Sequence, residues 1–299
     1  MSPAASPRYA DVIARIQDVE AATCEIIGDA TGHPMWGVTF GTPAQDRWHV
    51  LLTGGVHGDE PAGVEAVVRF LEGFAAAYLE RFTFHVIPRV NPSGYEAGTR
   101  LNGAGQDINR SMSDSDVIES ITLRRMLQDR RFDIFFDLHE DYEATGYYMY
   151  EAQQQDRLLG AQIVETVKQE VGPIDSDANT DAGLDTPISE GLFGVNPKWR
   201  EQGWSAYGYF KGANHGILPE TPSTAWPLDQ RVAAHQTAGR VHQHVVADGV
   251  GLGVQALQDA QRPVVLVAGD GAGVVFCRVV ELEAGVPGHV VMVCYEMSS

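Results

Sequence analysis

The sequence predicts an α/β fold, with a doubly wound, mostly parallel sheet, helices on both faces, and a small C-terminal β appendage. Strand-like and helix-like segments alternate along most of the 299 residues, which is typical of strands joined by crossover helices. The run Phe132–Leu138 is apolar at nearly every position, as in a central strand covered on both sides. The last β-rich runs have no helix between them, which indicates an antiparallel appendage.

The first half of the chain reads as helix, strands, helix and strand. Apolar residues at helical spacing predict a helix over Tyr9–Glu20, and Pro at the first helical position predicts another from Pro61. The helices are expected at Tyr9–Glu20 and Pro61–Tyr78, and the extended segments at Cys24–Ile27, Trp36–Gly41, Trp48–Thr53 and Phe82–Ile87.

A polar stretch of about thirty residues follows, which is long for a structureless connection and therefore predicts a functional loop. Beyond it, periodicity again predicts alternating elements. The helices are expected at Val117–Arg130, near Asp156–Val171 and over Pro227–Ala247, and the strands at Phe132–Leu138 and His215–Pro219, with a loop region at Gly172–Gly212.

Two domains are expected: an α/β domain over residues 1–261 and a β-rich appendage over residues 262–299. The appendage is predicted from three β-rich runs separated by glycine-containing turns. These runs are Val264–Val267, Val274–Glu281 and His289–Tyr295.

Composition narrows the functional classes. The chain carries 40 acidic and 21 basic residues, a formal charge of −19, so it should repel phosphate backbones and not bind nucleic acid. No run approaches the roughly 18 apolar residues that span a bilayer, so no membrane association is expected. Met1–Asp18 lacks a basic patch followed by an apolar run, and we therefore expect a cytoplasmic protein. The three cysteines lack the paired spacing of a zinc knuckle or redox motif.

The segment Gly-Gly-Val-His57-Gly-Asp-Glu60-Pro lies between a predicted strand and a predicted helix. Open α/β sheets place ligand sites at such strand ends. An imidazole and a carboxylate three residues apart can reach one Zn²⁺. Taken alone the pair is a weak signal, because an acidic residue at a helix N-terminus explains Glu60 without a metal.

His139 follows the apolar strand Phe132–Leu138 and should reach the same sheet edge. Three ligands of the type His, Glu, His with an open fourth position are typical of a catalytic zinc site. A carboxylate after another short apolar run, Glu220, is a candidate general base for the zinc-bound water. Glu220 could instead cap the helix that begins near Pro227, but it lies too far upstream.

The polar loop Asn91–Arg110 contains Arg100 and Arg110. Guanidinium groups bind carboxylates with two parallel hydrogen bonds and stabilise developing negative charge. In a chain with few basic residues, two arginines near a metal site indicate a function beyond a solvated loop.

The order His-x-x-Glu, Asn-Pro-x-Gly, Arg, Asp-x-Asn-Arg, Asp-x-His, Glu resembles the carboxypeptidase A-like zinc metallocarboxypeptidases and the related succinylglutamate desuccinylase/aspartoacylase branch. The resemblance covers about residues 36–221. It implies one Zn²⁺ per chain on His57, Glu60 and His139, with Glu220 as general base. It also implies roles for three further groups: Arg100 polarises the scissile carbonyl, Asn109 and Arg110 bind the substrate carboxylate, and Asp107 orients His57.

Two features depart from the simplest carboxypeptidase. The mobile tyrosine of that family has no clear counterpart, and Tyr207 and Tyr209 are the candidates. The terminal β segment after Arg262 has no place in the simplest carboxypeptidase domain, whereas the related desuccinylase/aspartoacylase branch carries an added β domain. The expected activity is release of a C-terminal amino acid from peptides by cleavage next to a free carboxylate. The alternatives are deacylation of N-acyl amino acids and a catalytically silent peptide-binding module, against which Glu220 argues.

Overall fold

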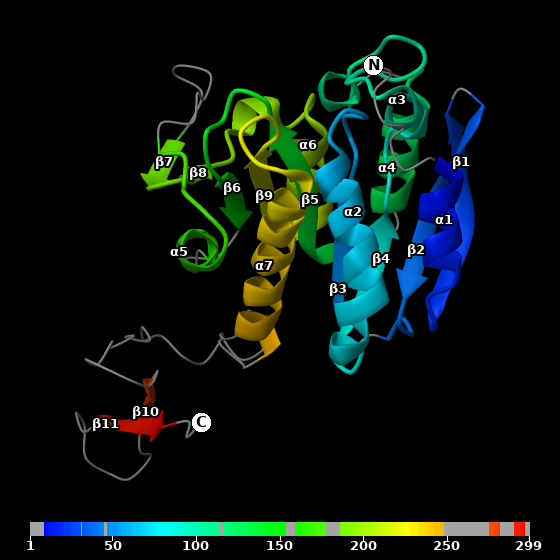
Figure 1. Ribbon diagram of the computed structural model, residues 1–299. Coiled ribbons are helices and arrows are strands. Elements are labelled where there is room, and N and C mark those ends of the chain that lie inside the picture. The colour runs from blue at the N-terminus through cyan, green and yellow to red at the C-terminus, as the bar shows by residue number, and fades with distance from the viewer. Residues whose placement is uncertain are drawn as a thin grey trace. The chain divides into compact units, whose positions relative to one another are not determined.

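The computed structural model describes residues 9–30, 32–44, 47–113, 116–128, 130–153, 159–176, 186–247, 275–281 and 290–296. The chain divides into two compact units, Met1–Ala247 and Asp248–Ser299. Figure 1 shows the first unit as a sheet with helices packed on it. Within the described residues, every helix is too short or too polar to cross a bilayer.

The first unit is built on a nine-stranded sheet in the order β1-β2-β4-β3-β5-β9-β6-β8-β7. The strands are β1 Ala22–Ala30, β2 His33–Phe40, β3 Trp48–Gly54, β4 Phe82–Ile87, β5 Phe132–Asp141, β6 Tyr148–Gln153, β7 Thr186–Ser189, β8 Leu192–Gly194 and β9 Ala213–Pro222.

The expectation of a mostly parallel sheet is wrong, because the sheet is mixed. Strands β4, β3, β5 and β9 run parallel in the centre, and β6 is parallel to β8. The pairs β1–β2, β2–β4, β6–β9 and β7–β8 are antiparallel, so each direction accounts for four of the eight pairings. A pattern of apolar residues reveals a strand but not its direction. A connection as short as that between β1 and β2 can join only antiparallel strands.

Helices cover both faces of the sheet, as expected (Figure 1). The helix α2 (Pro61–Arg69) packs against α7 (Leu228–Ala247) on one face, and α4 (Ile118–Gln128) packs against α6 (Trp204–Gly212) on the other. The remaining α-helices are α1 Tyr9–Gln17, α3 Pro92–Ala97 and α5 Gly160–Glu170. A π-helical turn and a 3₁₀ turn continue α2 to Tyr78, where the sequence predicts its end.

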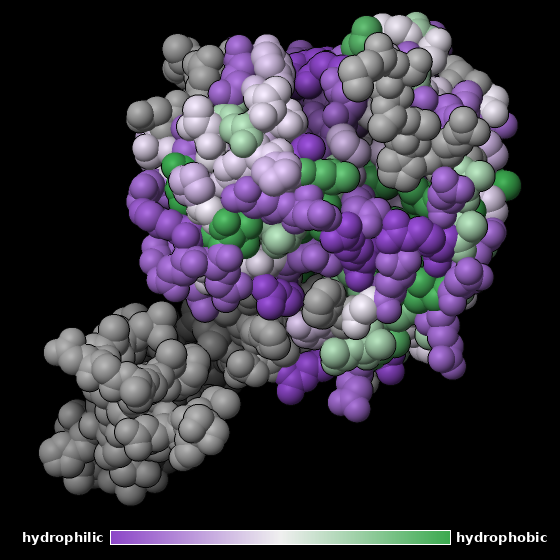
Figure 2. Space-filling view, viewed as in Figure 1, coloured by the Kyte–Doolittle hydropathy of each residue, from purple (hydrophilic) through white to green (hydrophobic). Residues whose placement is uncertain are grey.

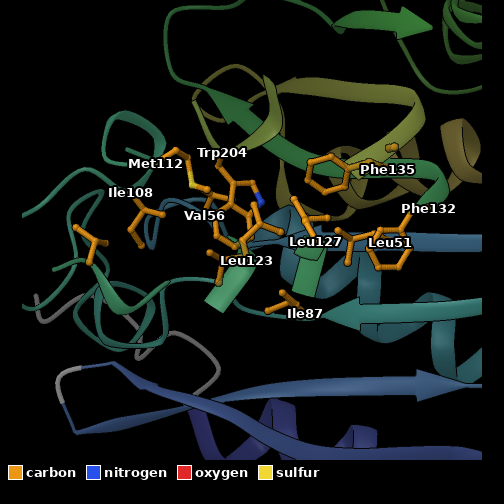
Figure 3. Packing of buried hydrophobic residues seen from close by; sticks show 13 residues of the cluster. Leu51, Val56, Ile87, Ile108, Met112, Leu123, Leu127, Phe132, Phe135 and Trp204 are labelled. Atoms are coloured by element: carbon orange, nitrogen blue, oxygen red, sulfur yellow. The ribbon is translucent and has the colours of Figure 1, made fainter. Parts of the chain in front are cut away.

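Alternate residues of β5 pack into the hydrophobic cores on the two faces of the sheet. Phe135 packs with Leu51 of β3, Leu127 of α4 and Trp204 of α6 in the cluster shown in Figure 3. Phe136 and its alternating neighbour Leu138 lie on the α2–α7 face. Both faces of this strand are therefore covered, which explains its nearly uninterrupted apolar run. In the view of Figure 2, hydrophilic residues cover most of the coloured surface and hydrophobic ones are scattered among them.

The loop region expected at residues 172–212 contains elements that the sequence analysis missed, namely β7, β8 and α6. The second unit contains a two-stranded antiparallel sheet of β10 (Val275–Glu281) and β11 (Val290–Glu296). The third predicted run, Val264–Val267, lies outside the described residues.

Candidate metal centre and active site

His57, Glu60 and His139 meet at the carboxyl ends of β3 and β5. Gly55 adopts a positive φ of 64° after β3, which a glycine tolerates without strain and which turns the chain toward His57. Glu60 immediately precedes Pro61, the first residue of α2. The three side chains are buried, with exposed fractions of 3%, 5% and 2%.

The Glu60 carboxylate lies between the two imidazole rings. Its Oε1 contacts His57 Nδ1, and its Oε2 lies 3.1 Å from His139 Nδ1. One ligand atom from each residue lies within 4.8 Å of the other two. The structure thus brings the three predicted ligands together with their donor atoms converging.

Further carboxylates face the outer nitrogens of both histidines. His139 Nε2 lies 2.9 Å from Asp137 Oδ2, and Asp137 also accepts hydrogen bonds from Thr53 Oγ1 and Ser205 Oγ. His57 Nε2 lies 3.6 Å from Asp107 Oδ1. A carboxylate at Nε2 holds the proton there and leaves the Nδ1 lone pair for a metal.

The charges around the cluster shift its pKa values. Burial opposes protonation of His57, but Glu60 and Asp107 outweigh it and raise the His57 pKa. Burial is likewise outweighed at His139, where Asp137 and Glu60 raise the pKa well above its ordinary value. Burial raises the pKa of Glu60, but the two histidines outweigh burial and lower it. The cluster therefore favours positive charge between these carboxylates.

The residues fit a divalent metal. Two imidazole nitrogens and one carboxylate are a donor set typical of catalytic zinc sites with an open position. The outer carboxylates on both histidines match the arrangement usual around metal-bound imidazoles.

Glu220 lies beside the cluster within β9. It is the register partner of His139 on β5, so both side chains project from the same face of adjacent strands. The strand extends further than the sequence predicts, and Glu220 is part of it. Burial raises the pKa of Glu220 well above its ordinary value, and the nearby Glu60 adds to this while His139 opposes it. A raised pKa makes a carboxylate a better proton acceptor.

Arg100 and Asp107 lie next to His57, as expected. The Arg100 Nε donates to Asp107 Oδ2 at 3.1 Å, and its Nη1 lies 3.4 Å from His57 Nδ1. The Arg100 side chain is 43% exposed. It thus combines contact with the cluster and access from solvent.

Asn109 and Arg110 follow in a 3₁₀ turn, Ile108–Arg110. Asn109 Oδ1 accepts from the backbone N–H of Trp204 at 2.7 Å, so its Nδ2 group is the part left to bind a ligand. Arg110 donates to the Asn109 carbonyl oxygen at 2.9 Å, and its guanidinium stacks 4.8 Å from the Trp199 ring centre. Asn109 is thus held against the start of α6, and the exposed Arg110 lies against Trp199.

The structure does not bring Tyr207 or Tyr209 to the cluster. Both lie on α6, where Tyr207 packs against the core cluster of Figure 3. Tyr209 is buried, and this burial raises its pKa. The charged group that acts on it is Arg131, which precedes β5 and lowers the pKa. The sequence could not show this because α6 lies in a region predicted as loop.

Tyr148 of β6 lies beside the candidate base, although the sequence does not single it out. It is the register partner of Glu220, and its hydroxyl donates to Asp141 Oδ2 at 2.9 Å. Burial and the neighbouring Glu220 raise the Tyr148 pKa. The alternating aromatic residues Tyr148 and Tyr150 signal a strand, but not its pairing with β9.

Comparison with known proteins confirms the resemblance inferred from the motifs. Residues 47–172 match the profile of the succinylglutamate desuccinylase/aspartoacylase catalytic domain, a segment that includes the three candidate ligands. Over this segment the chain is similar to that catalytic domain.

Curated relatives match over shorter segments. Carboxypeptidase 2 of Trichophyton tonsurans is 36% identical over 74 residues, 23% of this chain and 14% of that protein. Murein peptide amidase A of Escherichia coli K12 is 34% identical over 88 residues, 29% of this chain and 35% of that protein. The matches therefore span well under two-thirds of these relatives.

The fold has solved counterparts. A metallo-carboxypeptidase from Burkholderia cenocepacia superposes with a TM-score of 0.64 at 22% identity, covering 82% of this chain and 70% of that one. The similarity shows a shared carboxypeptidase-like fold.

Proposed function

We propose that this protein is a zinc-dependent hydrolase that cleaves an amide bond next to a free carboxylate. The observation that carries the proposal is the placement of Glu220 directly across from His139, beside the converging His57, Glu60 and His139. A base next to three metal ligands is the arrangement that metal-assisted hydrolysis requires. One Zn²⁺ per chain is expected, since the described residues form one such cluster.

Different residues of the protein carry out different steps of the proposed hydrolysis. His57, Glu60 and His139 would hold a zinc ion, which would act as a Lewis acid and would lower the pKa of a bound water to about 7. Glu220 accepts a proton from the attacking water and returns it to the leaving nitrogen. Arg100, which is in contact with His57 and open to solvent, donates to the carbonyl oxygen as negative charge develops on it.

Recognition of the free carboxylate falls to Asn109 and Arg110. The Arg110 guanidinium is planar and held against Trp199, and such a group binds a carboxylate with two parallel hydrogen bonds. Asn109 contributes its Nδ2 donor because Oδ1 is already occupied by α6. The products are a carboxylic acid and an amino acid whose α-carboxylate lies at these residues.

The first candidate substrate is a peptide, from which the enzyme releases the C-terminal amino acid. This follows from the sequence similarity to carboxypeptidases. The second candidate is an N-acyl amino acid. The profile match to the desuccinylase/aspartoacylase catalytic domain favours it, and the same bond chemistry serves both.

A panel of substrates tests the proposal. Zinc-loaded protein is incubated with peptides, their C-terminal amides, and N-acyl amino acids, and amino-acid release is measured. Free carboxylates should be preferred by more than about 10³-fold, because a site built to pair a charged group strongly rejects an analogue that lacks it. Arg110→Ala should erase most of this preference.

Arg100→Ala is the matched control, since it should slow hydrolysis of acids and amides alike. Equal cleavage of acid and amide by the unmodified protein would contradict the assignment of Arg110. Release from N-acyl amino acids but not from peptides would select the deacylase.

A further inference from the structure

Glu140 follows His139 on β5, but its side chain lies on the opposite face of the sheet, as the alternation of a strand requires. It is buried, with an exposed fraction of 6%. Its Oε1 accepts a hydrogen bond from the backbone N–H of Ala62 at 2.6 Å, and its Oε2 pairs with Arg231 Nη1. These contacts give Glu140 no direct part in the chemistry at Glu220.

The Ala62 contact matters because α2 lacks a cap of its own. Glu60 occupies the N-cap position and makes no side-chain cap hydrogen bond, since its carboxylate faces His57 and His139. The first N–H groups of a helix need acceptors from elsewhere. Glu140 provides one from the neighbouring strand, and its negative charge suits the positive end of the helix dipole.

Arg231 connects this junction to α7. Besides its ion pair with Glu140, its Nε donates to the Trp226 carbonyl oxygen at 3.1 Å. The Arg231 side chain is 11% exposed and that of Glu140 is fully buried. The two side chains thus form a fixed link from β5 to the start of α2 and to α7.

The backbones of α2 and β5 also approach closely at this point. A Cβ on Gly63 would lie 2.7 Å from the Leu138 carbonyl oxygen, closer than side-chain atoms normally come. The junction therefore lies between the two ligand-bearing segments, one residue from His139 and two from Glu60. A small shift here changes the separation of the two ligands.

We propose that Glu140 and Arg231 are positioning residues that hold Glu60 and His139 at the separation needed for metal binding. The proposal rests on the metal site of the proposed function. Neither residue touches substrate, and their effect passes through the α2 N-terminus. Loss of the pair should therefore weaken zinc binding, and it should lower turnover only through that loss.

Glu151 supplies a matched control. It is a buried carboxylate on β6 that accepts from the backbone N–H groups of Leu159 and Gly160, at 2.8 and 2.7 Å, at the start of α5. It also pairs with His215 Nε2 at 2.7 Å. The chemistry resembles that of Glu140, but α5 carries none of the candidate ligands.

The test compares Glu140→Gln with Glu151→Gln in the full chain. Zinc affinity of metal-free protein is measured by competition with a chromophoric chelator, and the melting temperature is recorded for each variant. Both variants should have a lower melting temperature than the wild type. Only Glu140→Gln should bind zinc more weakly, by about 10- to 100-fold, the range for residues that support metal ligands.

Two further measurements keep the test decisive. The visible spectrum of the Co²⁺-loaded protein should change in Glu140→Gln and not in Glu151→Gln, because it reports ligand geometry. Arg231→Lys keeps the charge but cannot reproduce the planar fork of donors. Arg231→Lys should weaken zinc binding less than Glu140→Gln does. If Glu140→Gln does not fold, Arg231→Lys is compared with Glu151→Gln in its place.

Zinc affinity equal to wild type in both Glu140→Gln and Arg231→Lys would overturn the proposal, as would equal weakening in Glu151→Gln. Wild-type protein that takes up no metal would contradict the metal site and the positioning pair together. Wild-type protein that binds zinc but hydrolyses no substrate would contradict the proposed function alone, and the comparison of variants would still decide the role of Glu140.

Discussion

Two pairs of histidines lie in or beside the central parallel strands β3, β4 and β5. At the carboxyl ends, the rings of His57 and His139 lie 5.1 Å apart. The second pair is His49, near the amino end of β3, and His85, within β4, and their rings lie 5.4 Å apart. The two pairs have the same composition and similar spacing, and they differ in their neighbours.

Carboxylates surround the first pair, whereas an arginine and a backbone carbonyl oxygen flank the second. Arg130 Nη1 donates to His85 Nδ1 at 2.9 Å, His85 Nε2 lies 3.1 Å from His49 Nδ1, and His49 Nε2 lies 3.1 Å from the Ala44 carbonyl oxygen. This chain of contacts is satisfied when both rings are neutral. Burial and Arg130 lower the His85 pKa to about 4.

The comparison shows that the surroundings of a histidine pair decide its chemistry. Glu60, Asp107 and Asp137 raise the pKa values of His57 and His139 and make that pair attractive to a cation. Arg130 makes the other pair unattractive to one. Four experiments test this difference, from the largest expected effect to the smallest.

Loss of one histidine from each pair should give opposite outcomes. His139→Ala removes a ligand and should abolish zinc binding and hydrolysis, because two remaining ligands do not make a catalytic site. His85→Gln should retain both. Elemental analysis and turnover measure the effect, and zinc retained by His139→Ala would place the metal elsewhere.

Replacing the candidate base separates catalysis from metal binding at the carboxyl ends. Glu220→Gln keeps the size of the side chain but cannot accept a proton from water at neutral pH. We expect zinc binding to persist and kcat to fall by at least about 10²-fold, the lower range for a positioned general base. Near-normal turnover would assign the base to another residue.

The raised pKa values predict the pH dependence of zinc affinity. His57 and His139 bind protons in the metal-free protein up to a higher pH than free histidine does, and zinc must displace those protons. Affinity should therefore fall as pH is lowered through neutrality, by about tenfold per pH unit for each proton released. Chelator competition at several pH values measures this, and a flat profile between pH 6 and 8 would contradict the predicted shifts.

The second pair should affect acid stability instead. The folded-state pKa of His85, about 4, lies below its ordinary value of 6.5, so the unfolded chain binds more protons between these values. The contribution of His85 is fully present above pH 6.5 and is lost as pH falls toward 4, by at most about 3 kcal/mol.

Urea unfolding of wild type and His85→Gln at pH 7 and pH 5 measures this contribution. The variant should lose less stability between the two values, because Gln does not take up a proton. Equal losses in the two proteins would show that His85 is protonated as readily as in the unfolded chain.

Much of the site followed from local sequence. Gly55, His57 and Glu60 occur within one short turn, and an apolar run delivers His139 to the same edge. The carboxyl ends of neighbouring parallel strands meet regardless of the details of packing. The ligands and Glu220 could therefore be predicted to converge from the sequence, whereas the roles of Arg100 and Asp107 were implied by the resemblance to the metallocarboxypeptidases.

The tertiary structure decided what depends on distant pairing. Tyr148, rather than Tyr207 or Tyr209, lies beside Glu220 because β6 returns antiparallel to β9, and hydrophobic pattern does not encode strand direction. Glu140 contacts Ala62 and Arg231 from positions 78 and 91 residues away in the sequence. Periodicity could show which side of β5 carries Glu140, but only the packed helices determine what it meets there. Sequence by itself thus determined the kinds of residues that reach the sheet edge, and packing determined their neighbours, since those neighbours are brought together only when the sheet and its two helix layers form.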